Sequence, residues 1–246
     1  MSRKKSTKKV PVTNRERILS DSTNFSTVEA YKLVRTNIMF SLPKSDKAKT
    51  IAVSSASPGE GKTTTAINLA ITFAQTGVKT LIVDCDMRKS RVHRYLGFER
   101  GSGLSNVLCG FTTFDEAVRK NIRPSLDCLT SGELPSNPSE LLMSDEFKKV
   151  FDHISDMYDY VILDTPPMVV VADALMVAKE STGLVLVLRK GTSTYGMLDK
   201  VIDSVSQTDI KVLGAIFLEG GEKKAPYKYT YKNKYVYDYG DDSKDE

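Results

Sequence analysis

The sequence predicts an α/β fold in which a doubly wound, mostly parallel sheet is covered by helices on both faces. Short apolar runs that read as strands alternate along the chain with segments of helical periodicity. Such continuous apolar strands are typical of a parallel sheet that is buried on both sides. A glycine-rich loop follows the first strand, and aspartates end later strands. These residues occupy the carboxyl ends of the strands, where ligands bind in folds of this class.

Each predicted element follows from a local pattern. The first helix, over residues 26–42, has apolar residues at spacings of three and four, and Ser26 or Thr27 is expected to cap its start. Its predicted buried stripe is Val28, Tyr31, Val34, Ile38 and Leu42. Further helices are predicted near residues 61–76, 138–156, 172–179 and 194–207, and strands over residues 50–55, 80–86, 126–132, 160–167, 183–189 and 212–218.

Length and composition predict one large domain with short extensions. The 246 residues are 40% apolar and carry a net charge of +4, which is ordinary for a globular protein. No apolar run approaches the ~18 residues of a membrane span, and no secretory signal is expected. The three cysteines lack metal or redox spacing and are expected to be buried thiols. The predicted divisions are a basic flexible arm over residues 1–25, a single domain over 26–220 and a flexible tyrosine-rich tail over 221–246.

The segment ASPGEGKT, residues 56–63, has the pattern of a phosphate-binding loop between a strand and a helix. Gly59 and Gly61 allow backbone N–H groups to close around phosphate oxygens, and the helix start adds its dipole. Lys62 would reach the β- and γ-phosphates, and the Thr63 hydroxyl would bind Mg²⁺. The predicted nucleotide-binding residues are Ser57, Pro58, Gly59, Glu60, Gly61, Lys62, Thr63 and Thr64.

Three aspartates follow predicted strands. Asp84 and Asp86 are two residues apart, which places both carboxylates on the same side of a strand, and Asp164 takes the Walker B position. Carboxylate and hydroxyl oxygens suit Mg²⁺, and one aspartate can instead accept the proton of an attacking hydroxyl. The sequence therefore predicts a P-loop NTPase with a MinD-like Walker A, A′ and B arrangement. The pattern leaves open which of Asp84, Asp86 and Asp164 binds the ion and which accepts the proton.

Motifs of other nucleotide-dependent proteins are missing. A GTPase would normally carry NKxD, and the nearest string, NKYV at residues 233–236, lacks the aspartate. A eukaryotic-type protein kinase would carry GxGxxG, HRD and DFG motifs, and the sequence contains no DFG. The remaining interpretation is an ATP-binding site with one additional strand that ends in acidic residues, Asp84 and Asp86.

In these motifs the chain resembles the bacterial tyrosine kinases (BY-kinases) of capsule and exopolysaccharide export, specifically the separate cytoplasmic kinase of the CpsD/CapB type. The resemblance implies a protein-tyrosine kinase that depends on ATP and Mg²⁺. Its implied metal ligands are Thr63, Asp86 and Asp164. Its implied catalytic residues are Lys62, Asp84 and Asp86, with Asp84 as the base, although the roles of the three aspartates can be permuted. The matching segments are EAYKLVRTNIMF (29–40), the phosphate loop, LIVDCDMRKSRVH (81–93), LTSGELPSNPSELL (129–142) and VILDTPP (161–167).

The end of the chain is similar to the autophosphorylation cluster of that family. Residues 226–246 contain four Lys and five Asp or Glu, so each added phosphate makes the segment more negative. About 20 residues can extend roughly 65–70 Å, which is enough to reach a neighbour's site and predicts phosphorylation in trans. The Y-x-Y alternation also fits an edge strand. The predicted acceptors are Tyr227, Tyr229, Tyr231, Tyr235, Tyr237 and Tyr239.

The resemblance also implies partners. Glu29, Lys32 and Arg35 match the family's E-x-x-R-x-x-R helix of ring-shaped homo-oligomers, with Lys in place of one Arg; a solvated charged face is the alternative. Other expected partners are a membrane adaptor of the chain-length-regulator type, a tyrosine phosphatase and protein tyrosine substrates, but no nucleic acid. The expected location is the cytoplasm, at the inner face of the membrane through the adaptor.

Two other functions fit parts of the sequence. A ParA/MinD-type ATPase switch shares the fold, but that class begins its phosphate loop with a lysine where this chain has Ser57. A scaffold that binds ATP with little kinase activity is the second alternative. Leu218 stands where related ATPases often have an asparagine near the adenine, so no adenine contact is predicted there.

Overall fold

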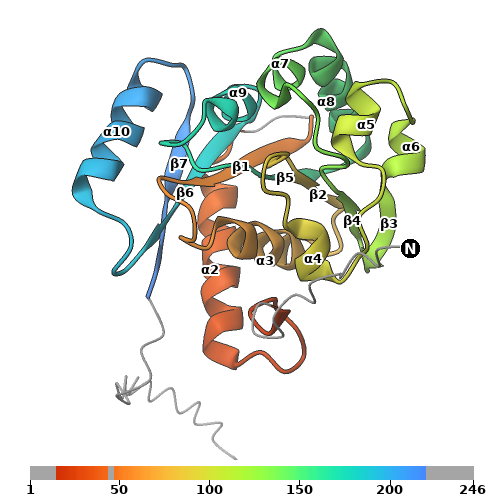
Figure 1. The fold of residues 1–246 in the computed structure, drawn as a ribbon. Helices are drawn as coiled ribbons and strands as arrows, with labels where there is room; N and C mark the ends of the chain where they lie inside the picture. The colour runs from red at the N-terminus through yellow and green to blue at the C-terminus, as the bar shows by residue number, and fades with distance from the viewer. Residues whose placement is uncertain (1–14, 44–46, 220–246) are drawn as a thin grey trace, which may run out of the picture.

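The computed structural model describes residues 15–43 and 47–219 and confirms the predicted α/β architecture (Figure 1). Within these ranges the strands form one sheet in the order β3-β4-β2-β5-β1-β6-β7. Only the β3–β4 pair at one edge is antiparallel. Because β5 pairs in parallel with both β1 and β2, the carboxyl ends of these three strands lie side by side. The strands are β1 Lys49–Ser55, β2 Thr80–Asp84, β3 Arg119–Arg123, β4 Leu126–Leu129, β5 Tyr160–Asp164, β6 Gly183–Arg189 and β7 Val212–Leu218.

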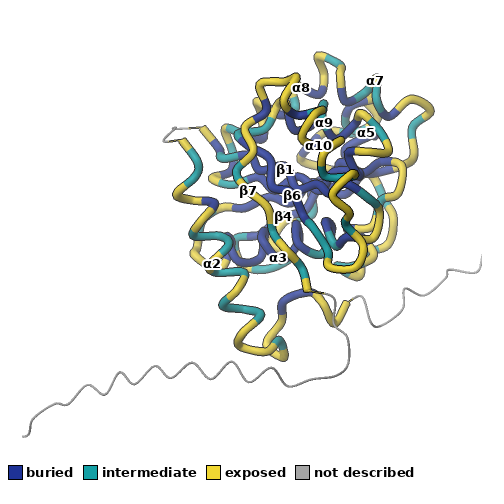
Figure 2. The backbone as a smooth tube through the Cα atoms, turned by 90° about the vertical axis from the view of Figure 1, so that its left-hand side faces the viewer, coloured by how far each residue is buried: buried dark blue, intermediate teal, exposed yellow. Residues whose placement is uncertain are grey.

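Helices cover both faces of the sheet, so its central strands are buried (Figure 2). Alternate residues of β1 belong to different cores: Ile51 and Val53 pack with α2 and α3, whereas Ala52 packs with α9 and α10. A third core lies between β2, β5 and helices α5 to α8. The helices are α2 Phe25–Ser41, α3 Lys62–Ala74, α4 Val92–Leu96, α5 Leu104–Leu108, α6 Phe114–Ala117, α7 Pro138–Leu142, α8 Asp145–Met157, α9 Asp173–Lys179 and α10 Tyr195–Ser206.

Helix α2 has the predicted buried stripe but a different cap. Ile38 is buried, and the other four predicted residues pack against the same core. The cap is Asn24, whose Oδ1 accepts a hydrogen bond of 2.8 Å from the Thr27 N–H. The prediction of Ser26 or Thr27 as cap was wrong because Phe25, an exposed residue outside the stripe, already lies in the first turn.

Several predicted elements are shorter than expected. Strands β2, β4 and β5 end at Asp84, Leu129 and Asp164, where the chain leaves the sheet to form loops. The helix predicted over residues 138–156 is two helices, α7 and α8. Ser144 breaks it, because its hydroxyl accepts a hydrogen bond from the Phe147 N–H and caps α8.

Other elements were missed because they carry little periodicity. Strand β3 has the polar sequence RKNIR, and its turn into β4 places Ser125 at a φ of 59°. Helices α4, α5 and α6 have only four or five residues each, too few to show a helical pattern.

The predicted arm ends earlier than residue 25. Ile18 and Leu19 are buried in the core beside α3. The Asn68 side chain of α3 accepts a hydrogen bond from the Leu19 N–H and donates one to the Arg17 carbonyl. The domain therefore includes at least residues 17–19, while residues 1–14 lie outside the described ranges.

Two further sequence-based expectations concern the membrane and the cysteines. In the described part of the chain, no helix is both long and apolar enough to cross a membrane. Cys85 and Cys128 are buried as expected, whereas Cys109 is exposed at the end of α5.

Candidate functional site

The loop between β1 and α3 has the backbone conformation that phosphate binding requires. Gly59 and Gly61 adopt φ values of 86° and 100°, which side chains rarely tolerate. Gly61 is also the N-cap of α3, and no side chain caps that end. The first-turn N–H groups of α3 are therefore available to an anion, and the helix dipole favours negative charge there.

A buried carboxylate holds this loop in place. Glu60 is fully buried, and its Oε2 accepts a 2.8 Å hydrogen bond from the Ser57 N–H. Its Oε1 accepts a 2.5 Å hydrogen bond from the Ser193 hydroxyl, and Ser193 in turn accepts one from the Arg189 N–H. The sequence analysis counted Glu60 among the loop residues but did not foresee that it links the loop to the β6–α10 connection.

Replacing Glu60 with alanine is expected to lower the free energy of unfolding by roughly 1–3 kcal/mol, because the half-buried donors of Ser57 and Ser193 lose their acceptor. Glu60→Gln should retain most of this stability, since the amide keeps an acceptor and can donate to the Ser193 oxygen. Urea unfolding without nucleotide measures the effect. An alanine variant as stable as the parent would contradict the linking role.

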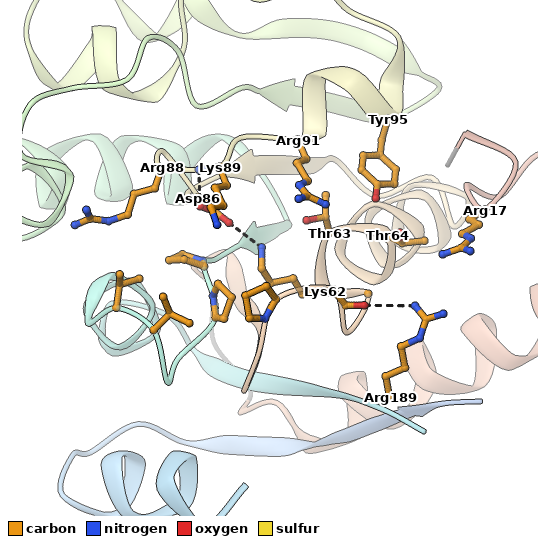
Figure 3. Close-up of a pocket in the computed structure, with 17 residues that line it drawn as sticks. Arg17, Lys62, Thr63, Thr64, Asp86, Arg88, Lys89, Arg91, Tyr95 and Arg189 are labelled. Atoms are coloured by element: carbon orange, nitrogen blue, oxygen red, sulfur yellow. Dashed lines mark hydrogen bonds and ion pairs between the residues drawn. The ribbon is translucent and has the colours of Figure 1, made fainter. Parts of the chain in front are cut away.

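Lys62, the first residue of α3, lies among acidic groups at the strand ends (Figure 3). Its Nζ is 2.9 Å from Asp86 Oδ2 and 3.8 Å from Asp164 Oδ1, and all three side chains are buried. Burial lowers the pKa of Lys62, but the attractions of Asp164 and Asp86 outweigh it and leave the pKa raised. Lys62 is therefore a charged group pointing at the space above the glycine loop.

Asp84 is enclosed by hydrogen-bond donors. It ends β2, is fully buried, and accepts hydrogen bonds from the Ser90 hydroxyl and from the N–H groups of Asp86, Arg91 and Val92. These contacts fix the connection between β2 and α4. Asp84 does not line the cavity at the glycine loop, whereas Asp86 does.

Asp164 differs from Asp84 in having no donors. It ends β5 directly beside Asp84 in the parallel register, and neither of its buried carboxylate oxygens accepts a hydrogen bond within the described ranges. Burial raises the pKa of both carboxyls above the usual range, and the charge of Asp164 adds to the effect on Asp84. The Lys62 ammonium and the Thr63 hydroxyl oppose the rise at Asp164 but do not cancel it. A buried carboxylate that is only partly compensated in this way can accept a further cation.

A second network ties the β2–α4 connection to distant segments. Arg88 Nε donates a 2.8 Å hydrogen bond to Asp173 Oδ2 at the start of α9, and its Nη2 donates to the Ser139 hydroxyl of α7 at 2.9 Å. The Ser139 hydroxyl donates to Asp173 Oδ1 at 2.6 Å. Sequence analysis missed this network, because residues 88, 139 and 173 are brought together only by the fold.

The cavity collects residues from five parts of the chain (Figure 3). Of the predicted loop residues, Ser57 and Glu60 do not line it, and they support the loop from behind. Arg17, from the segment before α2, was not foreseen. The lining residues are Arg17, Pro58, Gly59, Gly61, Lys62, Thr63, Thr64, Asp86, Arg88, Lys89, Arg91, Tyr95, Pro166, Pro167, Val170, Val171 and Arg189.

The remaining predicted residues lie elsewhere. Within α2, Lys32 Nζ is 2.8 Å from Glu29 Oε1, and Arg35 Nη1 donates to the Thr72 carbonyl of α3 at 2.7 Å. Leu218, the last residue of β7, lies against the glycine loop, where a Cβ at Gly61 would be 2.6 Å from its Cδ1. The six predicted acceptor tyrosines fall outside the described residues.

Comparisons with known proteins identify relatives of this chain. Residues 48–212 match the family described as AAA domain. The chain is 39% identical over 203 residues to tyrosine-protein kinase YwqD of Bacillus subtilis, across 82% of this chain and 85% of YwqD. It is 33% identical over 218 residues to tyrosine-protein kinase wzc of Salmonella typhimurium, across 88% of this chain and 30% of wzc. The kinase domain of Escherichia coli tyrosine kinase ETK matches with a TM-score of 0.76 and 32% identity, across 84% of this chain and 80% of that one.

A representative of the rival class fits less well. The septum site-determining protein MinD of Pyrococcus horikoshii matches with a TM-score of 0.59 and 22% identity, across 69% of this chain and 70% of that one. At this identity the match shows the shared P-loop fold alone. The ParA/MinD-type interpretation is therefore weaker than the tyrosine-kinase interpretation.

Proposed function

Because this chain belongs to the family of bacterial tyrosine-protein kinases, we propose that it transfers the γ-phosphoryl group of ATP to tyrosine hydroxyls, including those near its own C-terminus. The observation that carries the proposal is the placement of Lys62 near Asp86 and Asp164, at the start of a helix whose first-turn N–H groups no side chain caps. A triphosphate on this loop would bring its terminal phosphate to the Lys62 ammonium.

The donor set fits Mg²⁺. Thr63, Asp86 and Asp164 offer a hydroxyl and carboxylate oxygens, and the buried charge of Asp164 is only partly compensated by Lys62, 3.8 Å away. These residues would hold the ion together with phosphate oxygens, as Mg²⁺ sites on nucleotides commonly do. When bound, the ion neutralises charge that develops on the transferring phosphoryl group.

In the reaction itself, the acceptor oxygen forms a bond to the γ-phosphorus while the bond from that phosphorus to the β–γ bridging oxygen breaks. ADP leaves, and the phenol proton passes to a carboxylate. Lys62 would hold the phosphate, and a cavity-facing Asp86 would meet the acceptor hydroxyl. The burial of Asp84 and its hydrogen bonds from four donors support a positioning role for it, in place of the base role expected from sequence.

Partners and location belong to the same proposal. We propose a homo-oligomeric ring in which Glu29, Lys32 and Arg35 exchange their present contacts within the chain for contacts between subunits. A membrane adaptor would recruit the kinase to the inner face of the membrane, where it would regulate capsular or exopolysaccharide export, and a tyrosine phosphatase would reverse its modification.

Intact mass of the purified chain after incubation with ATP and Mg²⁺ tests the proposal. We expect mass steps of one phosphate each, up to six, that map by peptide analysis to Pro226–Glu246. The same sample without Mg²⁺ should gain no mass, and its native mass gives the oligomeric state. Turnover of ATP with no added mass, even with an adaptor-tail peptide, would favour an ATPase switch or a scaffold over a kinase.

A further inference from the structure

One wall of the cavity carries more positive charge than the nucleotide loop contributes. Arg88, Lys89 and Arg91 follow Asp86 on the β2–α4 connection and line the cavity on one side of Lys62 (Figure 3). Arg88 is held by Asp173. Lys89 and Arg91 are exposed, and no carboxylate of the described residues forms an ion pair with either. We call Lys89 and Arg91 the basic rim.

The backbone of the basic rim is held by Asp86 and Asp84. The Lys89 N–H donates to Asp86 Oδ1 at 3.0 Å, and the Arg91 N–H donates to Asp84 Oδ2 at 3.2 Å. The two cationic side chains therefore start from fixed positions near Asp86, the carboxylate that the proposed function places against the acceptor hydroxyl.

Apolar residues from the β5–α9 connection also line the cavity. They belong to the loop after Asp164, which is anchored where the Met168 N–H donates to the Ser55 carbonyl at 2.9 Å. Val170 lines the cavity and is 58% exposed, which leaves an apolar side chain open to solvent there. A flat phenol ring would cover such a surface. The apolar lining residues of this connection are Pro166, Pro167, Val170 and Val171.

The acceptor segment is itself divided by charge. Residues 226–235 contain four tyrosines and three lysines but no acidic residue. Residues 236–246 contain Tyr237 and Tyr239, all five acidic residues of the segment and one lysine. A tyrosine in the second half therefore brings negative charge with it, and a tyrosine in the first half brings positive charge.

We infer that the cavity mouth is an acceptor site that selects tyrosines followed by acidic residues, with the ring on the apolar surface and the acidic residues on the basic rim. Tyr237 and Tyr239 of a second copy are then modified before Tyr227, Tyr229 and Tyr231. The inference rests on the proposed kinase activity and adds its substrate class. Exposed ion pairs of this kind are weak singly, but several act together and are screened by salt.

Two peptides provide the probe: residues 236–246, VYDYGDDSKDE, and the same peptide with every acidic residue changed to its amide. The enzyme is the full chain with Tyr→Phe at the six tail positions, so that only the peptide accepts phosphate. We expect the acidic peptide to have a KM lower by roughly 5- to 30-fold, the effect of two or three exposed ion pairs, and this preference to shrink in high salt.

The variant Lys89→Ala/Arg91→Ala should reduce the preference to about twofold or less while the KM for ATP changes by no more than about twofold. The matched control is Arg94→Ala/Lys179→Ala, which removes two exposed charges outside the cavity and should leave the preference intact. Peptide mapping of the unaltered chain over time should show Tyr237 and Tyr239 modified first.

Each other outcome has a definite meaning. The acceptor site would be overturned, with the kinase activity left in place, if the enzyme used both peptides equally. It would also be overturned if the double variant raised the KM for ATP as much as the KM for the acidic peptide. Phosphate on neither peptide, and none on the tail of the unaltered chain, would overturn the proposed function and this inference with it.

Discussion

Replacing Lys62 with methionine is expected to slow tyrosine phosphorylation by a factor of about 10² to 10³, the usual effect of removing one preorganised electrostatic contact. The Lys62 ammonium is the buried cation nearest to Asp86 and Asp164, at 2.9 and 3.8 Å, and no neutral side chain can stabilise the transferring phosphate in its place. Initial rates on a tyrosine peptide, with ATP varied, measure the loss.

Two controls make this result interpretable. Lys179→Met removes an exposed lysine at the end of α9 and should leave the rate unchanged. Because Lys62→Met also leaves two buried carboxylates without their cation, its unfolding must be measured in parallel. A folded Lys62→Met variant with parental activity would show that the phosphate site has been assigned to the wrong residues.

Replacing Asp164 with asparagine is expected to abolish kinase activity and yet to stabilise the nucleotide-free protein at pH 8 by about 1–3 kcal/mol. The carboxylate is buried beside Asp84, and the Lys62 ammonium at 3.8 Å and the Thr63 hydroxyl do not offset the effect of burial on its pKa. Its burial disfavours the charged form, and asparagine removes that charge with little change of shape. At this position the native aspartate therefore lowers the stability of the nucleotide-free protein while it is needed for kinase activity.

The pH dependence of the stability shows whether burial of the Asp164 charge causes the gain in Asp164→Asn. Burial raises the folded-state pKa of Asp164 above its unfolded value, so the folded protein holds the proton more tightly. The associated stability is fully present below the unfolded pKa and is lost as the pH rises through the raised folded pKa. The advantage of Asp164→Asn should therefore be large at pH 8 and small near pH 4.

Urea unfolding without nucleotide at several pH values measures this advantage. Asp199→Asn, an exposed change on α10, serves as the control and should show no pH-dependent gain. If Asp164→Asn destabilises the protein at pH 8, then the ion pair with Lys62 outweighs the cost of burying the Asp164 charge, and the expected gain in stability would be refuted.

Much of the fold could be predicted because its signals are local. Continuous apolar runs indicated six of the seven strands of the described sheet. In the phosphate loop, the two residues with positive φ, Gly59 and Gly61, are the glycines of the sequence motif. The same reasoning placed Lys62, Asp86 and Asp164 at adjoining strand ends, since parallel strands bring their carboxyl ends to one edge. Strand β3 escaped because its polar sequence has no such pattern.

The sequence by itself determined the class of chemistry, and the tertiary structure decided what each residue does in it. Spacing alone could not separate Asp84 from Asp86; the β2–α4 connection does so by surrounding one with donors and exposing the other to the cavity. Glu60 connects the phosphate loop to the β6–α10 connection only because the fold brings Ser193, 133 residues away, to its carboxylate. Arg88 met Asp173 across 85 residues. Periodicity reports which face of an element is buried, but the direction of a polar side chain depends on the donors and charges that distant segments bring to it.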